Sequence, residues 1–111
     1  MGFFIAGGYM PDHEPLQNLR KQIKAIDAEL VAILQRRIEV VLQIGQYKEE
    51  HRLPVRDKNR ESEVIEQILS TPHDPMDSGA LKKLFEFIME ICRDAQHELM
   101  GKSKNDNSEM A

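Results

Sequence analysis

The sequence has few of the residues that form disulfide bonds, metal sites or nucleophilic centres. Its single cysteine, Cys92, excludes a disulfide bond within the chain. This is typical of proteins in a reducing compartment, and we expect a cytoplasmic protein. The four histidines have no spacing typical of metal ligands. Neither a glycine-rich phosphate loop nor a nucleophile motif is present, so the sequence predicts no metal site and no covalent nucleophile.

Long apolar runs and an excess of positive charge are also lacking. No apolar run reaches the roughly 18 residues of a membrane span. The segment 2–10 has no basic region ahead of a long apolar one, so we expect no signal peptide. The net charge of −4 does not favour a nucleic-acid surface. We therefore expect neither membrane nor nucleic acid as a partner, and any anionic ligand must be bound by local cations.

Helical periodicity is the main pattern that is present. Apolar residues spaced by three and four predict a long helix from Leu16 to about Glu50. A short helix is expected to follow Asp57, its N-cap, and to run to about Leu69. A third helix is expected from about Gly79 to Met100, with Gly101 as its stop. The predicted fold class is all-α, with helices that are long, short and long.

The length of the first helix predicts a second copy of the chain. We expect a flexible arm over residues 1–14, a helical domain over residues 15–100 and a disordered tail over residues 101–111. The first helix would be about 50 Å long, whereas a globule of this size is about 27 Å wide. The rest of the chain can hardly cover such a helix, so we predict an intertwined homodimeric helical bundle.

Two cations interrupt the apolar face of the long helix. Arg37 and Lys48 lie on the stripe that includes Ile33, Val41 and Ile44, about 16 Å apart along the axis. A buried face carries charge only where the charge has a partner. Either these side chains extend to water along the helix flank, or they bind an anion. Arg20 lies near the edge of the same face, about 25 Å from Arg37, and could reach such an anion only from a second chain.

The second and third helices contribute further polar candidates. Arg60 and Glu61 are expected on the inner side of the second helix. A favourable interaction with the helix dipole would also explain Glu61, and N-capping alone would explain Asp57. In the third helix, Gln96 flanks the apolar stripe and becomes a candidate donor if it meets Lys48.

In their order and spacing, these residues resemble the all-helical chorismate mutase family. The resemblance extends over about Leu16 to Leu99. Its motifs are Leu19-Arg20-x-x-Ile23-x-x-Ile26-Asp27, Arg37, Ile44-Gly45-x-x-Lys48, Pro54-Val55-x-Asp57-x-x-Arg60-Glu61 and Gln96. The resemblance implies the rearrangement of chorismate to prephenate in the shikimate pathway of aromatic amino-acid biosynthesis. It also implies a homodimer and no cofactor, because a pericyclic reaction needs neither cofactor nor nucleophile.

The resemblance further implies roles for individual residues. Arg37 and Arg20 of the partner subunit would bind the two carboxylates of the substrate. Lys48 and Gln96 would donate hydrogen bonds to the ether oxygen, where negative charge develops.

The remaining residues would bind the rest of the substrate. Glu61 would accept a hydrogen bond from the ring hydroxyl, with Asp57 near the same group. Arg60 would help to fix a carboxylate or order the site. The family position near the carboxylate is a serine in familiar bacterial members and Cys92 here. We expect Cys92 to line the site or pack against it, because a thiol is a weak donor.

Two other functions are open at this point. One is an isochorismate–pyruvate lyase, which uses a similar helical dimer and similar cations; Glu61 favours the mutase over it. The other is a helical dimerisation module without enzymatic activity, in which Arg37 and Lys48 pair with acids across the interface. That module leaves the ordered pattern of Asp57, Arg60, Glu61 and Gln96 unexplained.

Overall fold

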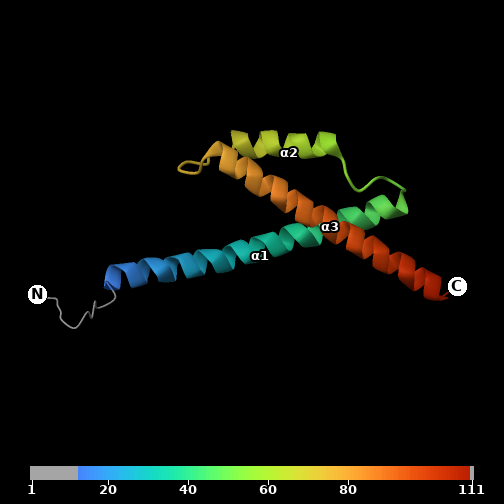
Figure 1. The fold of residues 1–111 in the computed structure, drawn as a ribbon, viewed down its shortest axis with the longest axis horizontal. Helices are drawn as coiled ribbons and strands as arrows, with labels where there is room; N and C mark the ends of the chain where they lie inside the picture. The colour runs from blue at the N-terminus through green and yellow to red at the C-terminus, as the bar shows by residue number, and fades with distance from the viewer. Residues whose placement is uncertain (1–12, 111) are drawn as a thin grey trace, which may run out of the picture. The chain divides into compact units, whose positions relative to one another are not determined.

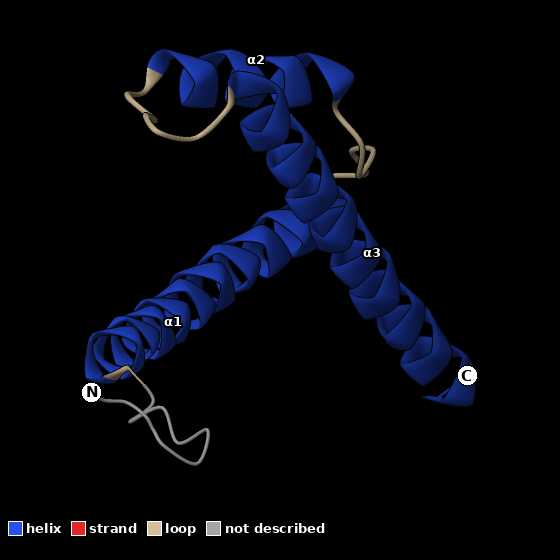
Figure 2. Ribbon diagram, turned by 60° about the vertical axis from the view of Figure 1, so that its left-hand side comes forward, coloured by secondary structure: helices blue, strands red, loops and turns tan. Residues whose placement is uncertain are grey.

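The computed structural model describes residues 13–110, with side chains described for residues 13–101. The described residues form three helices: α1, Glu14–Glu50; α2, Lys58–Ser70; and α3, Ser78–Met110 (Figure 1). Figure 2 shows only helices and loops over this part of the chain. The predicted all-α class and the order long, short, long are confirmed.

Helix α1 is flanked on both sides by a residue with positive φ. His13, at φ 47°, precedes it, and the N–H groups of Leu16 and Gln17 donate to its carbonyl. At the other end Arg52 has φ 55°; its N–H donates to the carbonyl of Glu49, and that of Leu53 to the carbonyl of Lys48. These two bonds form a Schellman motif, which ends α1 and turns the chain at Arg52.

Helix α2 has the cap that the sequence predicts. The carboxylate of Asp57 accepts a hydrogen bond of 3.0 Å from the backbone N–H of Arg60, and Asp57 itself has extended backbone angles. The expected inward residues Val64, Ile65, Ile68 and Leu69 are all partly buried, and α2 packs against α3. This packing places the first turn of α2 beside α3.

Helix α3 corrects one prediction. It continues through Gly101 to Met110 instead of ending there. Glycine ends a helix where the backbone needs a positive φ, and Gly101 does not adopt one. A glycine inside a helix costs only about 1 kcal/mol relative to alanine, and no proline follows it.

The predicted N-terminal arm and C-terminal tail are tested only at their edges. Residues 1–12 of the arm lie outside the described residues, and Glu14 already belongs to α1. Residues 101–110 have a helical backbone, so the boundary drawn at residue 100 is not a helix end. The division into arm, domain and tail otherwise stays a prediction.

The chain divides into two units at Arg37. In the part of α1 before Arg37, the apolar residues are largely exposed, with Leu19 and Ile23 both at 57%. In the second unit the C-terminal part of α1 crosses α3. The buried residues of the described chain all belong to this second unit: Gly45, Leu81, Met89, Cys92 and Gln96. None of the described helices is long and apolar enough to cross a membrane.

Candidate active site

At the crossing of α1 with α3, two of the expected site residues, Arg37 and Cys92, contact each other, and a third, Gln96, contacts the backbone of α1. Arg37 Nη1 donates to Cys92 Sγ at 3.0 Å. One turn further along both helices, Gln96 Nε2 donates to the carbonyl oxygen of Val41 at 2.8 Å. Arg37 is partly buried, while Cys92 and Gln96 are buried. Cys92 thus packs beside the cation of the long helix, and its expected place against a substrate site stays a prediction.

Gly45 makes room for Gln96. A Cβ atom added to Gly45 would lie 3.0 Å from Cγ and 3.4 Å from Cβ of Gln96. Contacts that short force one of the two helices or the glutamine side chain to move. Gly45 stands in one of the sequence motifs without a role predicted for it, although a glycine in mid-helix is an unfavourable choice that signals close packing.

Lys48 lies one helical turn beyond Ile44 and bonds to the loop that follows α1. Its Nζ donates to the carbonyl of Val55 at 2.7 Å. The reversal at Arg52 brings Val55 back to the side chain of Lys48. Lys48 and Asp57 line a cavity of about 320 Å³ in this loop region. The ammonium group has three donors, and the described chain uses one of them.

The described contacts do not bring Lys48 and Gln96 to a common acceptor. Gln96 donates to Val41 and Lys48 to Val55. Both acceptors are backbone carbonyls, which fix the direction of each side chain without neutralising the lysine. Each group keeps at least one donor that the described chain does not use.

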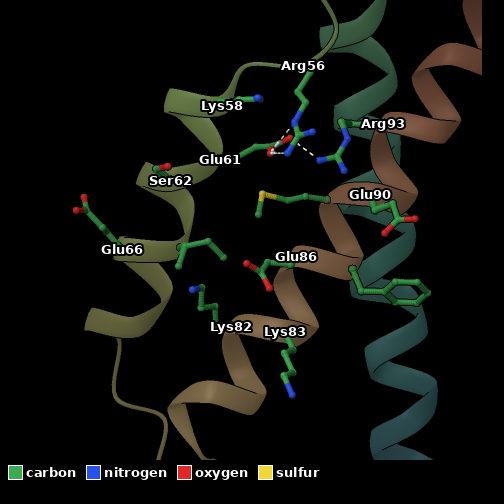
Figure 3. Close-up of a pocket in the computed structure, with 13 residues that line it drawn as sticks. Arg56, Lys58, Glu61, Ser62, Glu66, Lys82, Lys83, Glu86, Glu90 and Arg93 are labelled. Carbon is green, nitrogen blue, oxygen red and sulfur yellow. Dashed lines mark hydrogen bonds and ion pairs between the residues drawn. The ribbon is translucent and has the colours of Figure 1, made fainter.

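Glu61 lies in the first turn of α2 and is bonded by two arginines that were not predicted from the sequence. Arg93 Nη1 is 2.5 Å from Oε2 of Glu61, and Arg56 Nε and Nη2 are each 3.3 Å from Oε1. Figure 3 shows both guanidinium groups directed at the carboxylate. Glu61, Arg56 and Arg93 line a cavity of about 810 Å³ between α2 and α3. No local pattern links residues 61 and 93, which are 32 positions apart.

The structure contradicts the predicted placement of Arg60 and agrees with the capping role of Asp57. Arg60, expected on the inner side, is exposed, and its guanidinium pairs with Glu63 one turn later at 3.3 Å. That prediction is wrong within this chain, because the inward face of α2 is the one that carries Glu61, Val64 and Ile65. The Asp57 carboxylate caps the helix, as the simpler of its two explanations required.

Arg20 belongs to the part of α1 before Arg37. Its side chain is exposed and makes no hydrogen bond or ion pair with another residue of the described chain. It neighbours the exposed apolar residues Leu19 and Ile23. Arg20 is therefore an exposed cation beside an exposed apolar stripe.

The arrangement suits an anionic ligand that must be held and polarised. Arg37 supplies a partly buried guanidinium, which can bind a carboxylate with two parallel hydrogen bonds. Lys48 and Gln96 supply donors whose directions are fixed by backbone acceptors, and Glu61 supplies an acceptor. Such groups stabilise developing charge without covalent chemistry.

Comparisons with known proteins identify the family. The family model described as chorismate mutase type II matches residues 19–97. The chain is 33% identical over 98 residues to the bifunctional chorismate mutase/prephenate dehydratase of Escherichia coli K12, covering 86% of this chain and 25% of that protein. The corresponding Buchnera aphidicola protein is 30% identical over 100 residues, covering 89% and 26%. The chain thus spans about a quarter of the length of these curated relatives.

Two solved structures are similar over nearly their whole length. Chorismate mutase from Helicobacter pylori, in complex with prephenate, has a TM-score of 0.74 and 27% identity, covering 79% of this chain and 96% of that one. Form II of the Thermus thermophilus chorismate mutase has a TM-score of 0.73 and 28% identity, covering 75% and 94%. With most of its length matched by the family model, the chain belongs to the chorismate mutase type II family.

Proposed function

We propose that this chain is a chorismate mutase, an isomerase that converts chorismate to prephenate in aromatic amino-acid biosynthesis. The observation that carries the proposal is the placement of Arg37 and Lys48 on the C-terminal part of α1 and of Gln96 on α3, bonded to α1 where the two helices cross. The Helicobacter pylori relative, described in complex with prephenate, supports the same substrate class. A cytoplasmic location belongs to the proposal and rests on the single cysteine.

The reaction needs a flexible diacid held in a compact conformer and donors directed at the breaking C–O bond. The guanidinium of Arg37 binds one carboxylate in forked geometry. The unused donors of Lys48 and Gln96 meet the ether oxygen, where negative charge grows as the bond breaks. Because their carbonyl contacts already fix both side chains, little reorganisation is needed in the transition state.

The opposite end of the substrate lies toward α2. The carboxylate of Glu61 accepts the ring hydroxyl, and the cap residue Asp57 lies one turn ahead of it, near the same group. Arg60 is a weaker candidate for substrate binding, because its side chain is 63% exposed and paired with Glu63. Cys92 accepts from Arg37, so it contributes to the site by orienting that cation.

We propose that the active molecule is a homodimer. Several apolar residues in the part of α1 before Arg37 are at least half exposed; they include Leu19, Ile23, Ile26 and Leu30. Exposing such a stripe is unfavourable by about 25 cal/mol per Å² of apolar surface, and a second copy offers the matching stripe. On helix α1, Arg20 is about 25 Å from Arg37, so it completes the second carboxylate site only as Arg20 of the partner subunit.

Product analysis tests the proposed activity. Purified protein is incubated separately with chorismate and with isochorismate, and the products are identified by chromatography and mass spectrometry. Prephenate from chorismate is the expected result. If salicylate and pyruvate from isochorismate are the dominant products, the activity is that of an isochorismate–pyruvate lyase and the proposed mutase is wrong. No turnover of either compound by dimeric, folded protein would leave only a dimerisation module.

A further inference from the structure

Two arginines from different elements hold the carboxylate of Glu61, and each faces a different oxygen. Arg93, on α3, approaches Oε2, whereas Arg56, in the loop before α2, approaches Oε1 through Nε and Nη2 (Figure 3). An ionised carboxylate accepts about four hydrogen bonds. Three contacts therefore leave capacity for one more donor.

The contact with Arg93 is the more restrictive of the two. It is 2.5 Å long, and the side chains of Arg93 and Glu61 are only 23% and 20% exposed. The contacts of Arg56 are 3.3 Å long and its side chain is 53% exposed. A short, partly buried, charge-assisted bond orients its partner more strongly than a longer bond at the surface. Arg93 also joins α3 to α2, whereas Arg56 lies only five residues before Glu61.

The charge of this cluster also matters for an anionic substrate. Chorismate carries two carboxylates, and an isolated Glu61 would repel them. The guanidinium groups of Arg56 and Arg93 outweigh the single negative charge of Glu61. The cluster can therefore present an acceptor oxygen to a dianion while remaining positive as a whole.

We propose that Arg93 is a positioning residue that fixes the carboxylate of Glu61 so that Glu61 recognises the ring hydroxyl of the substrate. This inference rests on the proposed function. Without Arg93, Glu61 turns toward the exposed Arg56 and water, and the acceptor for the hydroxyl is no longer fixed. Arg93 thereby makes the site selective for a substrate that carries a hydroxyl donor at this place.

A purely structural role makes a different prediction. If Arg93 only tied α2 to α3, its loss would lower stability and would reduce turnover of every substrate by the same factor. Because the tie between the helices itself runs through Glu61, coupling between Arg93 and Glu61 is required by both roles, and coupling between Arg93 and the hydroxyl separates them.

The first experiment is a double-mutant cycle. Turnover of chorismate is measured for wild type, Arg93→Met, Glu61→Gln and the double variant, with urea unfolding of each. Arg93→Met is expected to lower kcat/KM by about 10- to 100-fold, the range for loss of a charged hydrogen bond. In the Glu61→Gln background the further loss is expected to be under about threefold, because the partner is already changed. Arg36→Met, an exposed arginine without a partner in the described chain, is the matched control and is expected to retain activity.

The second experiment changes the substrate. Chorismate methylated at the ring hydroxyl cannot donate to Glu61. The ratio of kcat/KM for chorismate to that for the methyl ether is expected to fall about tenfold or more in Arg93→Met. If Arg93→Met does not fold, Arg93→Lys keeps the charge and loses the forked geometry; it is expected to lower the same ratio by a smaller factor.

The outcomes separate this inference from the proposed function. A wild type that forms no prephenate overturns both. An active wild type overturns the positioning role alone if the Arg93 and Glu61 effects multiply independently, if both substrates lose turnover by the same factor, or if Arg93→Met is fully active.

Discussion

Gly45 of α1 and Gln96 of α3 are packed so closely that even a methyl group at position 45 would press on the glutamine side chain. A Cβ atom at position 45 would lie 3.0 Å from Cγ of Gln96. Gln96 is 6% exposed, and its amide is tied to the carbonyl of Val41 on α1. The glycine therefore leaves room for Gln96 to reach the carbonyl of Val41, although Gly45 itself has no side chain that could contact a substrate.

Substitution of Gly45 is expected to lower activity more than stability. Alanine gains about 0.5–1 kcal/mol of helix propensity, which offsets part of the strain, but it displaces the amide of Gln96. We expect Gly45→Ala to lower kcat by roughly tenfold and Gly45→Val to lower it further. Gly101→Ala is the matched control, because nothing lies within 4 Å of the added Cβ; it is expected to stabilise the chain by about 0.5–1 kcal/mol. Full activity of Gly45→Val would show that the close packing has no part in catalysis.

Lys48→Ala is expected to separate catalysis from folding. Removal of one donor to a developing negative charge lowers turnover by about 100- to 1000-fold where an enzyme stabilises an oxyanion, and we expect a loss of this order here. Lys48 is only partly buried and pairs with a backbone carbonyl, so the free energy of unfolding should change by less than about 1 kcal/mol. Steady-state kinetics and urea unfolding measure the two quantities. Lys24→Ala, at an exposed position of α1, controls for the loss of charge, and equal losses in both variants would contradict the role.

The amide of Gln96 should make activity independent of protonation at this position. An amide donates at any pH, whereas a carboxyl group donates only when protonated. We expect wild-type kcat to persist from about pH 5 to about pH 7.5 and that of Gln96→Glu to be high in acid and to fall toward neutral pH. The pH profiles of both proteins, with circular dichroism at each pH, test this. A sharp loss of wild-type turnover in this range, in folded protein, would argue against Gln96 as the donor.

Asp57 has one observed role and one proposed role, which two substitutions distinguish. Loss of the cap in Asp57→Ala is expected to cost about 1 kcal/mol of stability. Asp57→Ser keeps a capping oxygen for the N–H of Arg60 and should be nearly as stable as wild type. If Asp57 also lies near the substrate, Asp57→Ser will show a raised KM despite its stability. A wild-type KM in that variant would show that Asp57 acts only as the N-cap of α2.

The helices and the cap of α2 were predictable because their signals are local. Apolar spacing and Asp57 predict where α2 begins, and the structure agrees. The predicted helix end at Gly101 is wrong because a glycine permits a helix to end without requiring it. The inward placement of Arg60 failed because residues adjacent in a helix point in directions about 100° apart, and only Glu61 of the pair lies on the buried side.

The membership of the site stays a prediction, and the contacts of its expected residues were only partly predictable. Spacing on α1 selected Arg37 and Lys48, because cations on an apolar stripe are conspicuous in a sequence. The pairing of Glu61 with Arg93 could not be read in this way, since it depends on how α2 packs against α3. The function of Gly45 depends on the same kind of information, the distance between two helices.

Complementation between two inactive variants tests the central claim, a site shared by two chains. Arg20→Ala and Arg37→Ala are purified separately, unfolded, mixed in equal amounts and refolded together, and prephenate formation is measured. Each variant alone is expected to be strongly impaired. A random mixture contains mixed dimers with one intact site, so we predict recovery to about one quarter of wild-type activity. A mixture no more active than the two variants alone, with mixed dimers demonstrated by mass spectrometry, would contradict the account.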